Sequence, residues 1–274
     1  MLDQQQKQIL DKAFESWATD VISVAQVHNI SAQTAIGARL VEWSALDKGI
    51  IPARYQRNIG SIGIDGQKKL LESNCLIIGL GGLGGFVCEE LARLGAGLIA
   101  AVDFDYFEQT NLNRQLHSKP ENLGGKKTVE TKNRINKINS AVEFSGFDSK
   151  FNELPEQVWQ GTDIVFDCLD NIEDRLKLAH KCSELNKPLI HGAVAGWYGE
   201  VGVLWPQSDT LDKIYKNQTQ GMEKKLGTPV FTVATAAGIM VSEGVKILAG
   251  KTTKKERKIH FFDLMQDIWQ TVTM

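Results

Sequence analysis

The sequence lacks the features that mark several large classes of protein. Its four cysteines form no C-x-x-C pair, which argues against a zinc or dithiol redox site built on such pairs. Its 31 basic and 33 acidic residues nearly balance, so charge gives no support for a protein that coats nucleic acid or binds membranes through a basic surface. Only six prolines are present, and no repeat or low-complexity tract appears. What remains is the composition of an ordinary folded chain.

Targeting and membrane segments are also not expected. The first thirty residues carry acids throughout and show no basic start followed by an apolar core, so no signal peptide is predicted. The longest apolar run, at residues 229–241, contains two threonines and is too short to span a bilayer. We therefore expect a cytoplasmic protein with reduced cysteines, and neither a membrane nor a nucleic acid as its partner.

The first fifty residues predict an N-terminal helical extension. Apolar residues at helical spacing predict one helix over 3–25 and a second, capped by Asn29 or Ser31, that runs to about residue 46. Two helices joined by a turn are compatible with a DNA reader. However, four basic residues face six acidic ones in this segment, whereas DNA binding needs phosphate-neutralising charge. We divide the chain into this extension, residues 1–50, and one α/β domain, residues 51–274.

From residue 75 onward, short apolar runs alternate with helical segments. Runs at 75–80, 98–103, 142–147, 163–167 and 189–193 predict buried strands, and helices are predicted between them. This alternation predicts a doubly wound α/β sheet with a parallel core. Residues 200–205, 258–264 and 268–273 predict further, antiparallel strands at the C-terminal end. Between them we expect a mobile crossover loop over 206–229 and a helix over 232–248.

A glycine-rich turn predicts a nucleotide site. Gly79-Leu80-Gly81-Gly82-Leu83-Gly84 fits G-x-G-x-x-G between a predicted strand and a predicted helix. Glycines allow a tight turn, and the free N–H groups of the helix start bind phosphate. Asp103 ends the next strand, where a carboxylate can hold ribose hydroxyls. NAD and ATP both fit this pattern.

The segment after the second strand favours ATP. Asp103, Asp105, Asn111, Arg114 and Gln115 follow at the edge where open α/β sheets bind ligands. Nicotinamide needs an apolar slot, whereas acids, an amide and a guanidinium suit a nucleoside triphosphate with a metal ion. Lys127 begins the next helix and can point at the same phosphates.

These motifs together make the sequence recognisable. It resembles the ThiF/MoeB/HesA family of adenylating enzymes, which are related to the ubiquitin-activating domain. The resemblance covers residues 52 to 250. The matching stretches are Arg54-Tyr55-Gln56-Arg57-Asn58, Gly66-Gln67, Gly79 to Gly85, Asp103-Phe104-Asp105, Asn111 to Gln115, Gly124 to Lys127, Asp167 to Asn171 with Arg175, and Gly192 to Gly202.

The resemblance implies a Rossmann-like fold and a reaction. Such enzymes use ATP and Mg2+ to adenylate the C-terminal Gly-Gly carboxylate of a small β-grasp sulfur carrier protein of the ThiS or MoaD type, and release pyrophosphate. The products serve thiamine, molybdopterin or tungstopterin, or related sulfur-transfer biosynthesis. The resemblance also implies a homodimer.

Roles for individual residues follow from the same resemblance. Catalytic roles are implied for Arg114, Lys127, Asp170 and Arg57, of which Arg57 reaches into the partner subunit's site. Asp170 is also the implied magnesium ligand. The implied nucleotide-binding residues are Gly79, Gly81, Gly82, Gly84, Asp103, Asp105, Asn111, Gln115 and Asn171.

The sequence departs from the family in its cysteines. Many relatives hold a structural zinc on two C-x-x-C pairs, so we expect no zinc here. Residues 189–274 contain no cysteine, and we therefore expect the reaction to stop at the acyl-adenylate. Three alternatives stay open: an NAD(P)-binding oxidoreductase, an ATP-dependent activator of a small carboxylate, and a scaffold that binds nucleotide and carrier without turnover.

Overall fold

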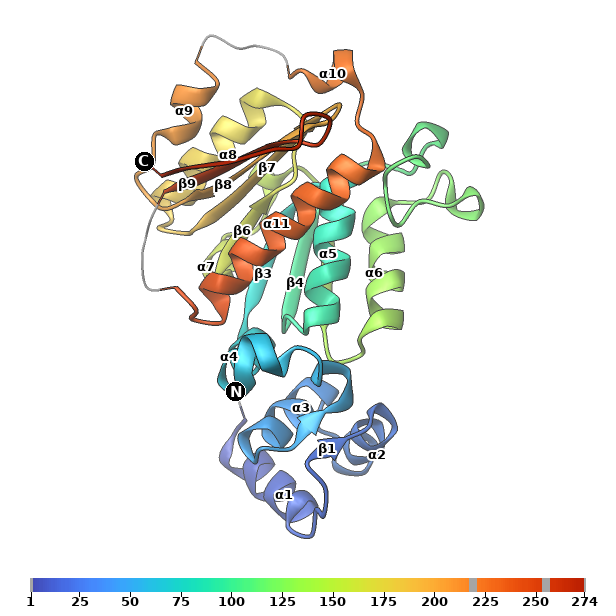
Figure 1. The fold of residues 1–274 in the computed structure, drawn as a ribbon. Coiled ribbons are helices and arrows are strands. Elements are labelled where there is room, and N and C mark those ends of the chain that lie inside the picture. Colours follow the sequence, from blue (N-terminus) through green and yellow to red (C-terminus); the bar gives the residue numbers. More distant parts are fainter. Residues whose placement is uncertain (1, 217–220, 253–256, 274) are drawn as a thin grey trace.

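The computed structural model describes residues 2–216, 221–252 and 257–273. Its centre is an eight-stranded sheet with the order β10-β9-β8-β7-β6-β3-β4-β5 (Figure 1). The parallel core consists of β3 (Asn74–Ile78), β4 (Leu98–Val102), β5 (Glu143–Phe147), β6 (Ile164–Asp167) and β7 (Leu189–Ala195). The antiparallel part adds β8 (Tyr198–Leu204), β9 (Lys258–Asp263) and β10 (Ile268–Thr273). The predicted doubly wound sheet with antiparallel C-terminal strands is confirmed.

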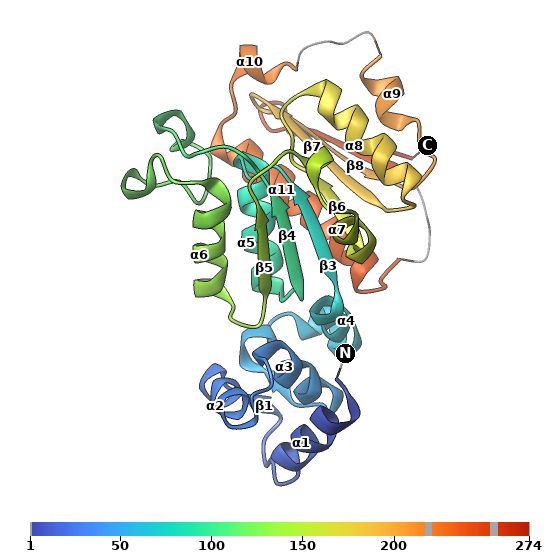
Figure 2. The ribbon, with the colours of Figure 1, turned by 180° about the vertical axis from the view of Figure 1, so that it is seen from behind.

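Alternate side chains of each strand enter two different cores, because successive strand residues point to opposite faces. In β3, Cys75 and Ile77 pack toward α5 (Gly82–Leu94) and α11 (Val230–Leu248). Leu76 and Ile78 pack on the other face, toward α7 (Glu156–Gly161), α8 (Ile172–Glu184) and α9 (Thr210–Ile214). Helix α6 (Lys127–Ile138) lies beside α5 and β5. Figure 2 shows the other face of the sheet, with α7 and α8. Strands buried on both faces account for the continuous apolar runs in the sequence.

The strand order places a crevice at one edge of the sheet. The chain runs from β3 through β4 to β5 in one direction, and β6 and β7 lie on the other side of β3. The order therefore reverses between β3 and β6, which is where open α/β sheets bind ligands at the carboxyl ends of their strands.

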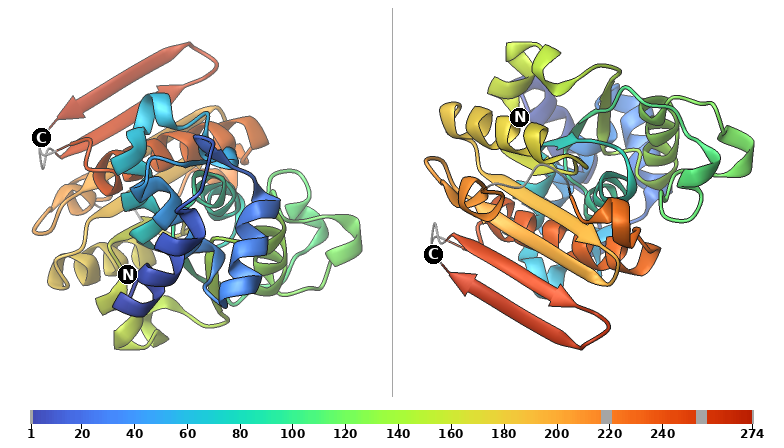
Figure 3. Two further views of the ribbon diagram at one scale, coloured as in Figure 1. Left: turned by 90° about the horizontal axis from the view of Figure 1, so that it is seen from below. Right: turned by 90° about the horizontal axis from the view of Figure 1, so that it is seen from above.

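The crossover segment contains more regular structure than the sequence indicates. Its described residues form α9 and α10 (Glu223–Leu226), while 217–220 lie outside the described residues. After α11, β9 and β10 form a hairpin that extends one edge of the sheet (Figure 3). Helix α11 is long and apolar enough to cross a membrane by length and composition alone. It packs against α5 and β7, however, and buries Val233, Ala237 and Met240.

The N-terminal residues fold into more and shorter elements than predicted. Helix α1 (Gln4–Phe14) ends well before residue 25, and β1 (Val21–Ile22) pairs with β2 (Ile51–Pro52). Helix α2 (Val24–Thr34) is capped by Ser23, whose hydroxyl accepts from the N–H of Gln26, and not by Asn29 or Ser31. Helix α3 (Ala38–Asp47) then packs on α4 (Ile59–Glu72), which leads into β3 (Figure 1). These N-terminal helices lie at the amino end of the parallel strands.

Candidate functional site

The glycine turn between β3 and α5 lies in the crevice. Gly79 has a φ of +94°, and a Cβ there would lie 2.7 Å from the carbonyl oxygen of Cys168. Gly79, Gly81 and Gly82 line the cavity at this edge. The N-cap of α5 is Gly81, which has no side chain to accept from the first N–H groups of the helix. The first N–H groups of α5 are therefore available to an anion. Gly84 does not line the cavity. It instead allows α5 to approach the turn closely, since a Cβ at Gly84 would lie 1.8 Å from the carbonyl oxygen of Gly79.

Asp103 is fixed beside this turn at the end of β4. Its Oδ2 accepts from the N–H of Leu80 at 2.6 Å, and its Oδ1 accepts from the N–H of Asp105 at 2.8 Å. Burial raises the pKa of Asp103, although Lys127 and the two backbone donors oppose this effect. The carboxylate lines the cavity next to the glycines, in the position expected of a ribose-holding acid.

Two cations reach the same cavity from different elements. Lys127 begins α6 and is buried, with its Nζ 3.0 Å from Asp105 and 3.8 Å from Asp103. Arg114 lies in the loop after η2 (Gln109–Asn111) and donates to the carbonyl of Thr110 and the side chain of Asn113. Within the described part of the chain, Arg114 forms no ion pair. Its charge is thus available to an anionic ligand.

The two amides of the same loop have different roles in the structure. Gln115 lines the cavity, and its buried Oε1 finds no hydrogen-bond partner among the described residues. Asn111, which we expected in the pocket, does not line the cavity: its Oδ1 accepts from the N–H of Glu108 at 2.9 Å and shapes η2. The Asn111 oxygen therefore shapes its own turn, as the side-chain oxygens of Asn and Asp commonly do.

The loop after β6 supplies the other side of the cavity. Asp170 is exposed and lines it, as does Asn171. Asn171 is the N-cap of α8 and accepts from the N–H of Asp174 at 2.8 Å. Within the described residues, no three metal-ligating side chains gather in one place. Mg2+ commonly binds through one or two carboxylates, waters and substrate phosphates, so the exposed Asp170 carboxylate, in the same cavity as the glycine turn, would suit this ion together with bound phosphates.

A buried polar network that the sequence did not reveal borders the cavity. His191 Nδ1 lies 2.7 Å from Asp167, and His191 Nε2 lies 3.0 Å from the hydroxyl of Tyr215, which donates to Glu200 at 2.5 Å. Burial lowers the pKa of His191, but the hydrogen bonds with Asp167 and Glu200 outweigh it and raise the pKa. Arg175 joins from α8 and donates to Asp167 and to the carbonyl of Gly192. Asp167 ends one predicted strand and His191 lies within the next, and this placement on neighbouring strands is the one signal that could have paired them.

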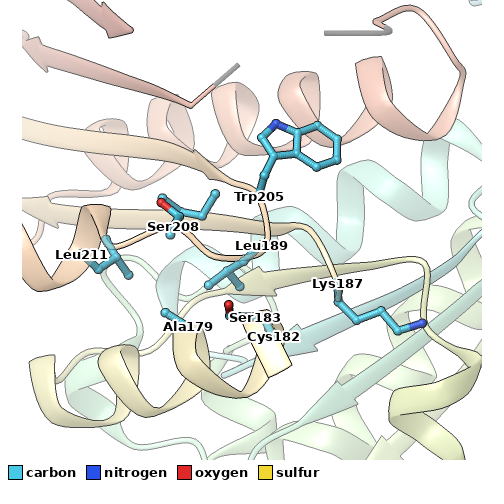
Figure 4. Close-up of a pocket in the computed structure, with 9 residues that line it drawn as sticks. Ala179, Cys182, Ser183, Lys187, Leu189, Trp205, Ser208 and Leu211 are labelled. Atoms are coloured by element: carbon cyan, nitrogen blue, oxygen red, sulfur yellow. The ribbon is translucent and has the colours of Figure 1, made fainter. Parts of the chain in front are cut away.

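These features line one continuous cavity of about 1400 Å³. It extends from the glycine turn past Asp170 to Tyr198, Glu200 and Phe261 on the antiparallel strands. Since pockets for single small ligands are about 300–1,000 Å³, this cavity has room for a nucleotide and part of a second substrate. A separate pocket under Trp205 and Leu211 measures only about 10 Å³, room for little more than a water molecule (Figure 4).

Arg57 is placed away from this cavity. It is exposed in the turn before α4, at the amino end of the parallel strands, and does not line the cavity of its own chain. Among the described residues it makes no hydrogen bond or ion pair.

The model of the ThiF family matches residues 55–274. The chain belongs to the ThiF family. This confirms the resemblance that the motifs indicated.

Named relatives agree on the enzyme class. The molybdopterin-synthase adenylyltransferase of Haemophilus influenzae is 31% identical over 207 residues, which are 72% of this chain and 85% of that protein. The sulfur carrier protein ThiS adenylyltransferase of Escherichia coli is 30% identical over 228 residues, 81% of this chain and 90% of that protein. The adenylyltransferase and sulfurtransferase MOCS3 of Xenopus laevis is 35% identical over 153 residues, but the match spans only 34% of that longer protein. These relatives are nucleotidyltransferases, as predicted for the family, and they do not favour the NAD(P)-dependent alternative.

Solved structures confirm the fold. The crystal structure of E. coli MccB with ATP has a TM-score of 0.67 at 20% identity, and the match covers 97% of this chain and 82% of that chain. PaaA has a TM-score of 0.65 at 18% identity over 80% of this chain and 82% of that chain. Both likenesses support a Rossmann-like α/β fold of the ThiF type.

Proposed function

We propose that this protein adenylates the C-terminal Gly-Gly carboxylate of a small β-grasp sulfur carrier protein, using ATP and Mg2+. The observation that carries the proposal is that one cavity combines a glycine turn, a buried lysine, an exposed aspartate and an arginine that has no ion pair within the described part of the chain. This set suits a triphosphate with a metal ion. The named activities of the sulfur-carrier relatives support the carrier as the second substrate.

Nucleotide binding is assigned to the glycine turn and its neighbours. The N–H groups at the start of α5 would face the phosphates, and Asp103 would hold the ribose hydroxyls. Gln115, with its unpartnered buried oxygen, would contact the same ligand. Asp170 would hold Mg2+, which supplies positive charge to the phosphate oxygens.

The chemical step needs no general base. The carrier carboxylate is ionised at neutral pH, so its oxygen attacks the α-phosphorus directly. A bond forms between that oxygen and phosphorus, the bond to the β-phosphate bridge oxygen breaks, and pyrophosphate leaves with the electron pair. The residues must align the reactants and stabilise charge on the phosphate oxygens. Lys127 and Arg114 fit this role because their nitrogens reach the cavity from α6 and the loop before it.

A homodimer would complete the site. Arg57 cannot serve its own pocket, because the length of the parallel strands separates the two. Five residues of β3 alone extend roughly 16 Å. An exposed arginine without a partner among the described residues is suited to enter the pocket of a second copy, as the family resemblance implies.

ATP–pyrophosphate exchange with Mg2+ tests the function. We expect exchange that depends on one β-grasp carrier and disappears when its terminal glycine is removed. ATP binding without exchange for any carrier would instead point to a small carboxylate as substrate, or to a scaffold. Absence of ATP binding would contradict the proposal altogether.

A further inference from the structure

The segment that carries Arg57 is held by buried hydrogen bonds on both sides of that residue. On one side, Tyr55 is fully buried, donates to Glu42 at 2.9 Å and accepts from Asn139 at 2.9 Å. On the other side, Asn58 donates to the buried Gln67 at 3.1 Å. Arg57 itself points to solvent. Arg57 and its neighbour Gln56 are thus exposed between two anchored residues, Tyr55 and Asn58.

The anchor of this frame comes from the N-terminal helices. Glu42 lies on α3 and has no exposed side-chain surface. One of its oxygens is 3.1 Å from Nε of Arg54, and the other accepts the Tyr55 hydroxyl. Arg54 also donates to Asn139, at the end of α6. Both partners of Glu42 therefore lie within three residues of Arg57.

Burial of the Glu42 carboxylate costs desolvation free energy, so its place in the core needs a reason other than stability. A buried ion pair often contributes no more to stability than apolar residues of similar volume. The Glu42 carboxylate instead favours one arrangement of Arg54 and Tyr55, because one oxygen accepts the Tyr55 hydroxyl and the other forms an ion pair with Arg54 without a hydrogen bond.

We propose that Glu42 is a positioning residue for Arg57, so that the N-terminal helices take part in adenylation by presenting this arginine to the partner subunit's pocket. This inference rests on the proposed function, in which Arg57 stabilises the transition state in the second copy. The N-terminal residues 1–50 would thereby act on the active site of the partner subunit and not on the site of their own chain.

Direct measurement of the segment comes first. Glu42→Gln keeps the side-chain shape but places an amide beside the Arg54 guanidinium, so we expect faster hydrogen exchange of the amides of residues 54–58 by mass spectrometry. Asp47→Asn is the matched control, because Asp47 also joins α3 to α4 through Lys68 but does not touch this segment. Equal exchange in the wild type and Glu42→Gln would overturn the inference.

Kinetics then link the frame to Arg57. Glu42→Gln should lower kcat for ATP–pyrophosphate exchange by up to about 100-fold, the loss that a misplaced group of about 1 Å can cause, and leave KM for ATP unchanged. In an Arg57→Ala background, the same substitution should cause no further loss. Equal losses in both backgrounds would show a general structural effect and contradict positioning.

Two further outcomes are separable. If Glu42→Gln does not fold, Tyr55→Phe removes the hydroxyl and leaves the Glu42–Arg54 pair, with the same expected exchange and kinetics. If Arg57→Ala alone keeps full activity, both the role of Arg57 and this inference fail. Variants of Lys127 and Arg114 still test adenylation in that case, so the two failures are distinguishable.

Discussion

At the residue scale, the two cations of the cavity are the sharpest test of the proposed chemistry. Lys127→Ala or Arg114→Ala should each remove about 2–4 kcal/mol of transition-state stabilisation, the range for one lost charge-stabilising donor. The measurement is kcat/KM for ATP–pyrophosphate exchange. Lys126→Ala is the control, because Lys126 pairs with Asp148 and does not line the cavity. Near-normal turnover in both cavity variants would contradict the assignment.

Asp103 should act on ATP affinity more than on turnover. Asp103→Ala removes the carboxylate that lines the nucleotide end of the cavity, so calorimetry should show weaker ATP binding. The pKa of Asp103 is raised above its ordinary value of 3.8 by burial, so wild-type ATP affinity should begin to fall at a higher pH than an ordinary aspartate would give. Asp148→Asn, outside the cavity, should bind ATP normally. Unchanged affinity in Asp103→Ala would exclude the ribose role.

The residues themselves show where sequence reasoning succeeds. The glycine turn and Asp103 lie together because both sit at ends of strands that the apolar runs predict. The sequence did not reveal that the amide oxygen of Asn111 accepts from the N–H of Glu108, or that Asn111 lies outside the lining of the cavity. The network of His191, Glu200 and Tyr215 was missed because it joins two strands and a helix end whose register depends on the whole sheet.

At the scale of elements, Gly84 controls how closely α5 approaches β3. A Cβ at Gly84 would overlap the backbone of the glycine turn, and backbone cannot move aside as a flexible side chain can. Gly84→Ala should therefore lower the free energy of unfolding by about 1–3 kcal/mol or more in urea titrations. Gly238→Ala, in the interior of α11 with no atom within 4 Å of the added Cβ, should be neutral or stabilising. Equal stability of the two variants would contradict this packing.

Glu89 joins α5 to α6 electrostatically. It is 2.6 Å from Arg93 and 2.8 Å from Arg134. Although its partial burial opposes ionisation, the nearby His117 and the two arginines hold its pKa far below the usual value of 4.5. A depressed acid stabilises the fold above its unfolded pKa and loses this contribution as the pH falls. Glu89→Gln should therefore cost about 1–3 kcal/mol of unfolding free energy at pH 7, and less as the pH falls below 4.5. A difference that does not change with pH would exclude an electrostatic origin.

The N-terminal elements show the limit of pattern reading at this scale. Apolar residues keep a helical spacing from Leu10 to Val24, which predicts one helix, yet α1 ends at Phe14. The chain turns there, and a capping box at Ser23 and Gln26 begins a new helix. Periodicity indicates which side chains are buried, whereas caps decide where helices end.

At the scale of the whole molecule, the order of the elements was predictable from the sequence. Whether one chain holds all the residues of the proposed active site was not. Alternating strands and helices specify a doubly wound sheet and thus the edge where ligands bind. The same reasoning does not place Arg57, because its position relative to a pocket depends on a second copy. One chain positions every proposed catalytic residue except this one at or beside its own cavity.

Mixing two impaired variants tests that arrangement directly. Arg57→Ala leaves the pocket intact, and Lys127→Ala leaves Arg57 intact, so a mixed dimer contains one site with both groups. Random exchange of subunits at equal amounts makes half the dimers mixed, with one of two sites complete, so about a quarter of wild-type exchange activity should return. Each variant incubated with itself is the control. If the mixture forms mixed dimers, shown by differently tagged chains, but recovers no activity, Arg57 does not complete the partner's site.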